Sequence, residues 1–225
     1  KVTHVEALIR WTNAKLGFVS PEDFIAVAEQ AGFIENITNW VINQAITDAA
    51  KFKNVDVDVS VAINLSAKDI MNPAILPNIL DLLNSHDLPT SSLSFELTEG
   101  DLVRDHEKAI THLQAFRDAG FELAIDDFGT GYSSLAHISE IPAQIIKIDR
   151  CFVTNIQESK SNQHIIEMIM LLADKFGFEV TAEGIETEAE HNWLIEAGCN
   201  IGQGYYYAKP MFYDDALQWL KGRSK

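Results

Sequence analysis

Residues 121–126, Phe121-Glu122-Leu123-Ala124-Ile125-Asp126, form a short apolar run that ends in an acid. A second run, Val59-Ser60-Val61-Ala62-Ile63-Asn64, ends in an amide in the same way. Short β-branched runs separated by helical stretches are typical of the buried strands of a parallel sheet. The sequence therefore predicts parallel strands whose polar residues lie at one end.

Two further runs carry acids at comparable places. Glu6 lies in the run at 4–10, and Glu96 lies in the run at 93–97. Carboxylates that recur at strand ends converge on one rim of the sheet, and clustered carboxylates require cations. This pattern indicates an active site.

The chain alternates strand and helix patterns along its length. We expect strands at 4–11, 59–66, 93–99, 121–127, 143–149, 179–185 and 201–206. We expect helices at 21–31, 38–52, 73–86, 105–119, 162–176, 187–197 and 213–222. This alternation implies an α/β fold with right-handed crossovers, either an open doubly wound sheet or a closed barrel. Polar residues at most of the strand ends favour a (β/α)8 barrel of the TIM type.

Closure of such a barrel takes eight strands, one more than the pattern supplies. We therefore expect one strand, with a helix, upstream of the chain. Pro21 and Pro73, each behind a capping residue, are predicted in the first turns of helices. Gly120 and Gly198 are predicted to cap helix C-termini. No low-complexity linker interrupts the pattern, so residues 1–225 are interpreted as a single domain.

Acidic residues outnumber basic ones by 33 to 17, which gives a net charge of -16. Such a surface repels duplex DNA and anionic lipid, so an anionic ligand needs local cations such as metal ions. No segment reaches the roughly 18 apolar residues of a membrane helix, and direct membrane insertion by this domain is not expected. Cys151 and Cys199 lack metal or disulfide spacing. Each is predicted to be a buried reduced thiol, which suits a cytoplasmic protein.

Adjacent aspartates, Asp126 and Asp127, form the sharpest local feature. Neighbouring residues on a strand point to opposite faces. Both can serve one site only if Asp126 ends the strand and Asp127 begins the turn that Gly129 and Gly131 allow. Two carboxylates roughly 5 Å apart repel by about 3 kcal/mol at an effective dielectric near 20, and a shared metal removes that cost. A turn capped by both aspartates is the alternative.

Further charged residues lie at or near the predicted strand ends. Glu99, three residues after Glu96, is expected past the strand end, where it supports a neighbouring loop. Glu183 and Glu186 repeat this spacing, and Glu186 is either functional or an acid beside the N-terminus of the next helix. Lys147 lies between isoleucines. Partial burial against carboxylates would keep it charged and able to position a water.

Two polar residues extend the candidate site. Arg10, four residues after Glu6, suits bidentate phosphate contact, or is an ordinary surface arginine. Asn64 offers a neutral oxygen ligand to Mg²⁺ or Mn²⁺, or simply begins the turn before Ser66.

These residues belong to an ordered set of motifs that covers nearly the whole chain. The set contains Glu6-Ala7-Leu8 with Arg10-Trp11, Asn64-Leu65-Ser66, Glu96-Leu97-Thr98-Glu99, Asp126-Asp127-Phe128-Gly129-Thr130-Gly131-Tyr132-Ser133-Ser134-Leu135, Lys147-Ile148-Asp149, Ala182-Glu183-Gly184-Ile185-Glu186, Gln203-Gly204-Tyr205 and Lys209-Pro210. In this order the motifs resemble the EAL-domain phosphodiesterases of bacterial cyclic di-GMP signalling.

The resemblance implies a barrel with an irregular first strand and hydrolysis of cyclic di-GMP to linear pGpG with two divalent ions. The ions would be Mg²⁺ or Mn²⁺, and Ca²⁺ would be non-productive. It assigns Glu6, Asn64, Glu96 and Asp126 to one ion, and Asp126, Asp127 and Glu183 to the other. It also implies that Lys147 holds the catalytic water and that Arg10 binds phosphate. By the same resemblance, Leu8 is a further binding residue, Gln203 lies near the metal and water network, and Glu99 anchors the loop after Asp127.

Family members usually follow sensory or diguanylate-cyclase-like domains, and such upstream partners are expected here. The family's upstream strand carries a Tyr-Gln-Pro type motif that this chain lacks. A homodimer through helices near the loop at 128–135, with the apolar stretch 165–169 contributing, is a further expectation, and core packing is the alternative for that stretch.

Two other functions compete with hydrolysis. A non-catalytic cyclic di-GMP receptor is one, although such receptors generally show an eroded triplet or missing aspartates, and this chain retains both. A barrel enzyme that uses Mg²⁺ to stabilise an enolate is the other, although the paired aspartates suit two metals better.

Overall fold

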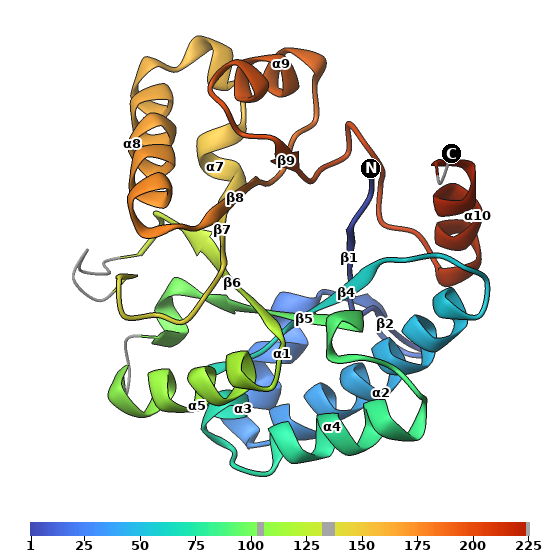
Figure 1. The fold of residues 1–225 in the computed structure, drawn as a ribbon. Coiled ribbons are helices and arrows are strands. Elements are labelled where there is room, and N and C mark those ends of the chain that lie inside the picture. The colour runs from blue at the N-terminus through green and yellow to red at the C-terminus, as the bar shows by residue number, and fades with distance from the viewer. Residues whose placement is uncertain (103–105, 132–137, 224–225) are drawn as a thin grey trace. The chain divides into compact units, whose positions relative to one another are not determined.

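The computed structural model describes residues 1–102, 106–131 and 138–223. It divides into two compact units, one formed by residues 1–95 with the C-terminal segment from Met211, the other by residues 96–210. Helices and strands alternate in both units (Figure 1). All seven stretches predicted to be extended contain a strand, and the expected α/β class is confirmed.

The first unit pairs β1 (His4–Glu6) in parallel with β4 (Ser60–Asn64), with Glu6 opposite Ala62. Its helices are α1 (Pro21–Ala31), α2 (Ile34–Lys53), α3 (Ala67–Met71), α4 (Ile75–Ser85) and α10 (Tyr213–Arg223). Helix α2 packs on β4, and Ile42, Ile46 and Ile63 are fully buried there. This burial fixes the strand that ends at Asn64.

The predicted first strand, 4–11, stops at Glu6, and a hairpin begins at its last residue, Trp11. β2 (Trp11–Asn13) pairs antiparallel with β3 (Gly17–Val19). The Asn13 side chain accepts hydrogen bonds from the N–H groups of Lys15 and Leu16, and Gly17 has φ of 71°. An asparagine that bonds the next residues, followed by a left-handed glycine, closes a tight turn. The expectation of one continuous strand over 4–11 was wrong, because β1 ends at Glu6 and Trp11 belongs to the hairpin.

The chain passes from the first unit to the second within a single strand. A short 3-10 helix, η1 (Thr90–Ser92), leads into β5 (Leu93–Thr98), which begins in the first unit and ends in the second. A second 3-10 helix, η2 (Glu99–Leu102), follows the strand directly.

Four strands of the second unit pair in parallel in chain order: β6 (Glu122–Phe128), β7 (Ile145–Ile148), β8 (Glu179–Ala182) and β9 (Ile201–Gly202). The helices are α5 (His106–Asp118), α7 (Arg150–Val153), η3 (Ile156–Glu158), α8 (Lys160–Phe176) and α9 (Glu188–Glu196). Helix α8 packs against β7 and β8 (Figure 1), and Ile146, Ile148 and Ile166 are fully buried.

Helix boundaries follow the sequence signals at most places. Pro21 is in the first turn of α1, as predicted. Gly120 and Gly198 follow α5 and α9 with φ of 94° and 92° and complete their C-terminal caps. Pro73 does not begin a helix: it precedes α4 by two residues, because Asn72 ends α3 and turns the chain through its side-chain bond to the N–H of Ala74.

Two other expectations need correction. The strand predicted at 201–206 is only two residues long. A turn at Gly204 ends it, in which the Gly204 carbonyl accepts hydrogen bonds from the N–H groups of Tyr207 and Ala208. Cys199 is buried and free as predicted, but Cys151 is free and exposed. Cys151 lies in the short helix α7, whose buried residue is Val153.

Stretch 165–169 divides between core and surface. Ile166 is fully buried and Ile169 is 6% exposed, whereas Met168 is 70% exposed. Core packing therefore accounts for the isoleucines of this helix face and leaves Met168 on the surface.

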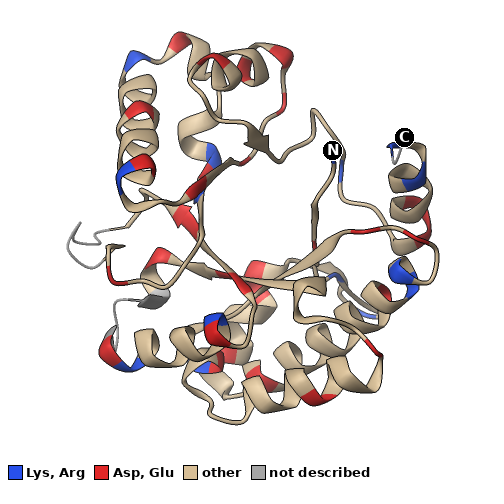
Figure 2. Ribbon diagram, viewed as in Figure 1, with Lys and Arg blue, Asp and Glu red and all other residues tan. Residues whose placement is uncertain are grey.

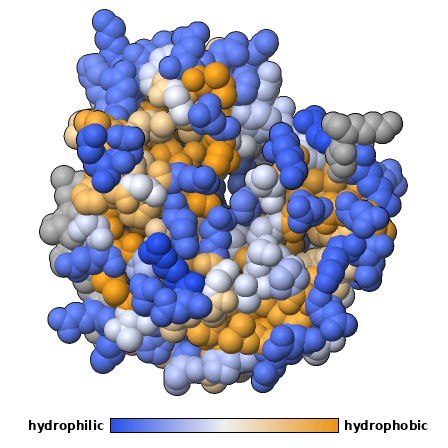
Figure 3. Space-filling model, viewed as in Figure 1, coloured by the Kyte–Doolittle hydropathy of each residue, from blue (hydrophilic) through white to orange (hydrophobic). Residues whose placement is uncertain are grey.

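Acidic residues appear on the helices of both units and on several strands (Figure 2), in keeping with the net charge of -16. Apolar groups interrupt this hydrophilic surface in patches on the viewed face (Figure 3). Among the described residues, none of the helices has the length and apolar character needed to cross a membrane.

Candidate metal centre

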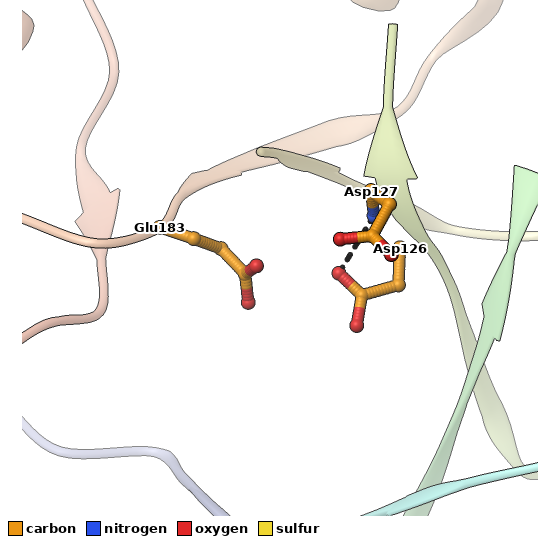
Figure 4. Close-up of side chains that lie close together, drawn as sticks. All are labelled: Asp126, Asp127 and Glu183. Carbon is orange, nitrogen blue, oxygen red and sulfur yellow. Dashed lines mark hydrogen bonds between the residues drawn. The ribbon is translucent and has the colours of Figure 1, made fainter. Parts of the chain in front are cut away.

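The second unit brings three carboxylates together at the ends of two strands. Asp126 and Asp127 lie on β6, and Glu183 directly follows β8. One oxygen of each lies within 4.8 Å of the others. Figure 4 shows the three side chains pointing toward one another.

A β-bulge explains how adjacent aspartates reach the same site. Ile125 pairs with Ile146 and Phe128 pairs with Ile148, so both Asp126 and Asp127 oppose the single residue between those partners on β7. Asp127 has φ of 52°, a left-handed conformation that aspartate tolerates better than most residues. An extra residue in one strand re-aims its side chain. Asp127 thus lies within β6 rather than beginning the turn, contrary to the expectation.

The residue opposite the two aspartates is Lys147. Its side chain is 3% exposed, and its Nζ lies 2.6 Å from Glu96 Oε2, 3.2 Å from Asp126 Oδ2 and 2.7 Å from Glu183 Oε1. The predicted burial of this lysine against carboxylates is confirmed. Glu96 is itself 5% exposed on β5. The ammonium group is therefore the counter-charge for three carboxylates.

Loss of solvent and nearby negative charge make the carboxyl groups of Glu183 and Asp127 harder to ionise. Loss of solvent raises the pKa of Glu183 to about 8, with Lys147 opposing the rise and Asp126 and Glu96 adding to it. Burial, with Asp126 and then Asp149, also raises the pKa of Asp127. Such shifts are characteristic of sites that gain a further cation or carry out acid–base chemistry.

The donor set fits a hard divalent cation. Every candidate ligand in the cluster is a carboxylate oxygen, and oxygen ligands suit Mg²⁺, Mn²⁺ and Ca²⁺. Positive charge placed among Asp126, Asp127 and Glu183 would relieve the repulsion that raises the pKa values of the last two. The residues therefore fit the predicted metal.

Glu99 lies just past β5, as predicted, at the start of η2. Its Oε2 accepts hydrogen bonds from the N–H groups of Gly129 and Gly131, at 3.1 and 3.3 Å. A Cβ added to Gly131 would lie 2.9 Å from the Glu99 carboxyl carbon. The glycine thus lets the loop after Asp127 close on this buried carboxylate.

The first unit brings together two other predicted ligands. Asn64, at the end of β4, donates from Nδ2 to Glu6 Oε1 at 2.9 Å, and Glu6 ends β1. The amide oxygen of Asn64 is not used in this bond and is a chemically suitable ligand atom for a hard cation.

Three predicted ligand-binding residues lie on the surface. Arg10 is exposed and donates to the carbonyl of Ile9, and Leu8 is 42% exposed. Gln203 is exposed, and its backbone bonds to Ala182 and Ile185 on either side of Glu183. The motif residues Tyr132 to Leu135 lie outside the described residues.

Two residues near the cluster were missed as contributors. Asp149 lies close enough to Asp127 to raise its pKa, and it caps α7 through the N–H of Cys151. Glu190 binds the backbone of the loop after Glu183. Its signal was available in the sequence, because threonine three residues before glutamate is a capping-box pattern.

Comparisons with known proteins agree with the geometry. Residues 1–210 match the family described as EAL domain. A cyclic di-GMP phosphodiesterase, PA2567 of Pseudomonas aeruginosa, is 35% identical over 98% of this chain, and PdeR of Escherichia coli, also named a cyclic di-GMP phosphodiesterase, is 34% identical over 98%. The chain spans only 38% and 33% of the lengths of these relatives.

A solved structure, the MucR phosphodiesterase in complex with cyclic di-GMP, is 33% identical and superposes with a TM-score of 0.89, covering 95% of this chain and 87% of that one. The barrel fold expected for the family is confirmed by this likeness.

Proposed function

The chain belongs to the EAL domain family, and from this premise we propose that it hydrolyses cyclic di-GMP to linear pGpG. One observation supports the proposal most directly: the buried Lys147 bonded to Glu96, Asp126 and Glu183, with Asp127 beside them. Relatives named as cyclic di-GMP phosphodiesterases match nearly the whole chain.

We assign Asp126, Asp127 and Glu183 as ligands of one divalent ion, Mg²⁺ or Mn²⁺. Bound divalent ions stabilise charge on a phosphodiester and lower the pKa of water. The family resemblance assigns Glu6, Asn64 and Glu96, with Asp126 shared, to a second ion. The hydrogen bond between Glu6 and Asn64 supports their common role.

Other side chains have roles that follow from their chemistry. Lys147 carries three N–H donors, and any donor released from a carboxylate can orient a water for attack. Arg10, exposed after β1, can bind a phosphate through its planar guanidinium. Glu99 holds the loop after Asp127 by two backbone bonds and thereby positions that aspartate. Leu8 and Gln203 are assigned to contacts around the ligand.

A turnover assay with Mg²⁺, Mn²⁺ and Ca²⁺ tests the proposal. Chromatography should detect pGpG with the first two ions and little with Ca²⁺. Tight binding of cyclic di-GMP with no pGpG at any metal concentration would instead support a receptor. No binding and no turnover would contradict both.

We also propose that the domain works beside other domains of a longer protein and as a homodimer. The greater lengths of the relatives support the first point, and the exposed Met168 on α8 supports an apolar contact. Light scattering of the protein at increasing concentration tests the dimer. A molar mass that stays at the monomer value over a roughly 100-fold range of protein concentration would contradict the dimer.

A further inference from the structure

The loop that carries Glu183 is held almost entirely through its backbone. The N–H of Glu183 donates to the carbonyl of Ile148 at 3.0 Å, and the N–H of Ile185 donates to the carbonyl of Gln203 at 3.1 Å. Tyr206 then donates to the carbonyl of Ile185 at 2.9 Å. These bonds align the loop with its neighbours on both sides.

A single side chain binds the rest of the loop. Oε2 of Glu190 accepts the N–H groups of Glu186 and Thr187, both at 2.9 Å, and Thr187 Oγ1 accepts the N–H of Glu190. This is a capping box at the start of α9. Most capping acids lie at the surface, whereas Glu190 is 3% exposed.

Glu190 also has a partner outside its own helix. Its Oε1 accepts the N–H of Asn155 at 2.9 Å. Asn155 has φ of 54° and lies just after α7, on the segment that follows β7. One buried carboxylate therefore joins the chain after β7, the strand of Lys147, to the chain after β8, which carries Glu183.

Close backbone packing leaves this loop little room to move. A Cβ on Gly184 would lie 2.4 Å from the Cβ of Arg150, and one on Gly204 would lie 2.1 Å from the carbonyl oxygen of Ile185. Both glycines have positive φ, 68° and 156°. The backbone position of Glu183 thus depends on close packing around Gly184 and Gly204.

We propose that Glu190 is a positioning residue for the metal site: it fixes the loop that aims Glu183 at Asp126 and Asp127. This inference rests on the proposed function, because it takes Glu183 as a metal ligand. Residues that orient metal ligands without touching the metal contribute substantially to metal affinity.

The first unit repeats the arrangement after another assigned ligand. Ser66, two residues beyond Asn64, forms a capping box with Asp69, which is 2% exposed. Asp69 also accepts from Thr38 Oγ1 on α2 at 2.9 Å. Asn64 and Glu183 are thus each followed by a buried acid that caps a helix and also binds a second element.

The experiment measures Mg²⁺ binding to metal-free protein by titration calorimetry, at a temperature where circular dichroism shows every variant folded. Glu190→Ala should bind Mg²⁺ at least ~10-fold more weakly than wild type. Glu190→Asp, which keeps the charge but shortens the side chain, should weaken binding in the same direction and serves if the alanine variant does not fold. Glu190→Gln should bind Mg²⁺ more tightly than Glu190→Ala but more weakly than wild type, because its amide oxygen can still accept from Glu186 and Thr187 whereas its NH2 group cannot accept from Asn155.

Leu83→Ala is the matched control. Leu83 is 1% exposed on α4 in the first unit, so its truncation destabilises the protein without touching the loop. It should bind Mg²⁺ as wild type does. Binding by Glu190→Ala or Glu190→Asp within twofold of wild type would overturn the inference, as would equal weakening by Leu83→Ala. Glu190→Gln as weak as Glu190→Ala would overturn the hydrogen-bonding role. Wild-type protein that binds no Mg²⁺ would instead overturn the proposed function.

Discussion

Replacing Lys147 by methionine removes the charge that holds three carboxylates together without metal. Its Nζ lies 2.6, 2.7 and 3.2 Å from Glu96, Glu183 and Asp126. At an effective dielectric near 20, each contact with an ionised carboxylate contributes about 5–6 kcal/mol of Coulomb attraction before the cost of desolvation is subtracted, and the contact with Glu183 does so fully only above its pKa of about 8. The net value is smaller, because removing one partner of a buried ion pair typically costs about 3–5 kcal/mol. We expect Lys147→Met to lower the free energy of unfolding of the metal-free protein by this amount.

The loss of stability becomes smaller when metal is present. A divalent ion supplies positive charge to the same carboxylates, so we expect the deficit of Lys147→Met to shrink to less than about 2 kcal/mol in saturating Mg²⁺. The difference is measured by urea unfolding in EDTA and in MgCl₂, supported by thermal scans. In metal-free buffer, about 3–5 kcal/mol corresponds to a fall in Tm of roughly 6–20 °C for a chain of this size.

Lys175→Met is the matched control, because Lys175 pairs with Asp174 at 3.2 Å but both side chains are about 70% exposed (69% and 73%). Exposed pairs contribute about 0–1 kcal/mol, so this variant should unfold like wild type in both buffers. A metal-free Lys147→Met protein within about 1 kcal/mol of wild type would refute the reasoning, as would a deficit that Mg²⁺ does not reduce.

Three further predictions follow from the same site. Asp126→Asn should abolish hydrolysis, because the shared carboxylate loses its charge, and activity within about tenfold of wild type would contradict the assignment. Gly131→Ala should destabilise the protein by about 1–3 kcal/mol in urea unfolding, since its Cβ would lie 2.9 Å from the Glu99 carboxyl; Gly222→Ala, with open space around it, should be neutral or stabilising. Burial raises the pKa of Glu183 from 4.5 to about 8, so the folded metal-free protein holds a proton that the unfolded chain has released. Its free energy of unfolding should therefore fall as pH rises from about 4.5 to 8, and a flat profile in EDTA would contradict the shift.

The sequence predicted elements better than it predicted local geometry. Apolar runs that end in Asn64 and Asp126 indicated strands, because burial of alternating or continuous apolar residues dominates strand formation. The hairpin at Trp11 to Val19 was missed because its first strand begins at the last residue of the predicted run 4–11 and its turn signal is a single asparagine. Short strands of three residues carry too little periodicity to be separated from such a run.

The candidate site divides in the same way. Lys147 stood out because a lysine flanked by isoleucines in an apolar strand is not needed for solubility. Its burial against carboxylates was predicted on that ground. Glu190 did not stand out, because a capping box is common and nothing in the sequence says that this acid is buried or that it reaches Asn155. Burial and contacts across elements come from packing, and packing depends on residues distant in the chain.

The bulge at Asp126 and Asp127 shows why a correct set of residues can accompany a wrong local picture. The alternation rule required a turn to bring both side chains to one face, and the chain instead inserts an extra residue into β6 opposite Lys147. A bulge is costly unless something compensates for the disturbed ladder. Part of the compensation is electrostatic, because the bulged strand places the Asp126 carboxylate 3.2 Å from the buried ammonium group of Lys147. The same arrangement leaves more negative than positive charge in the cluster, and that excess is what a divalent cation would neutralise.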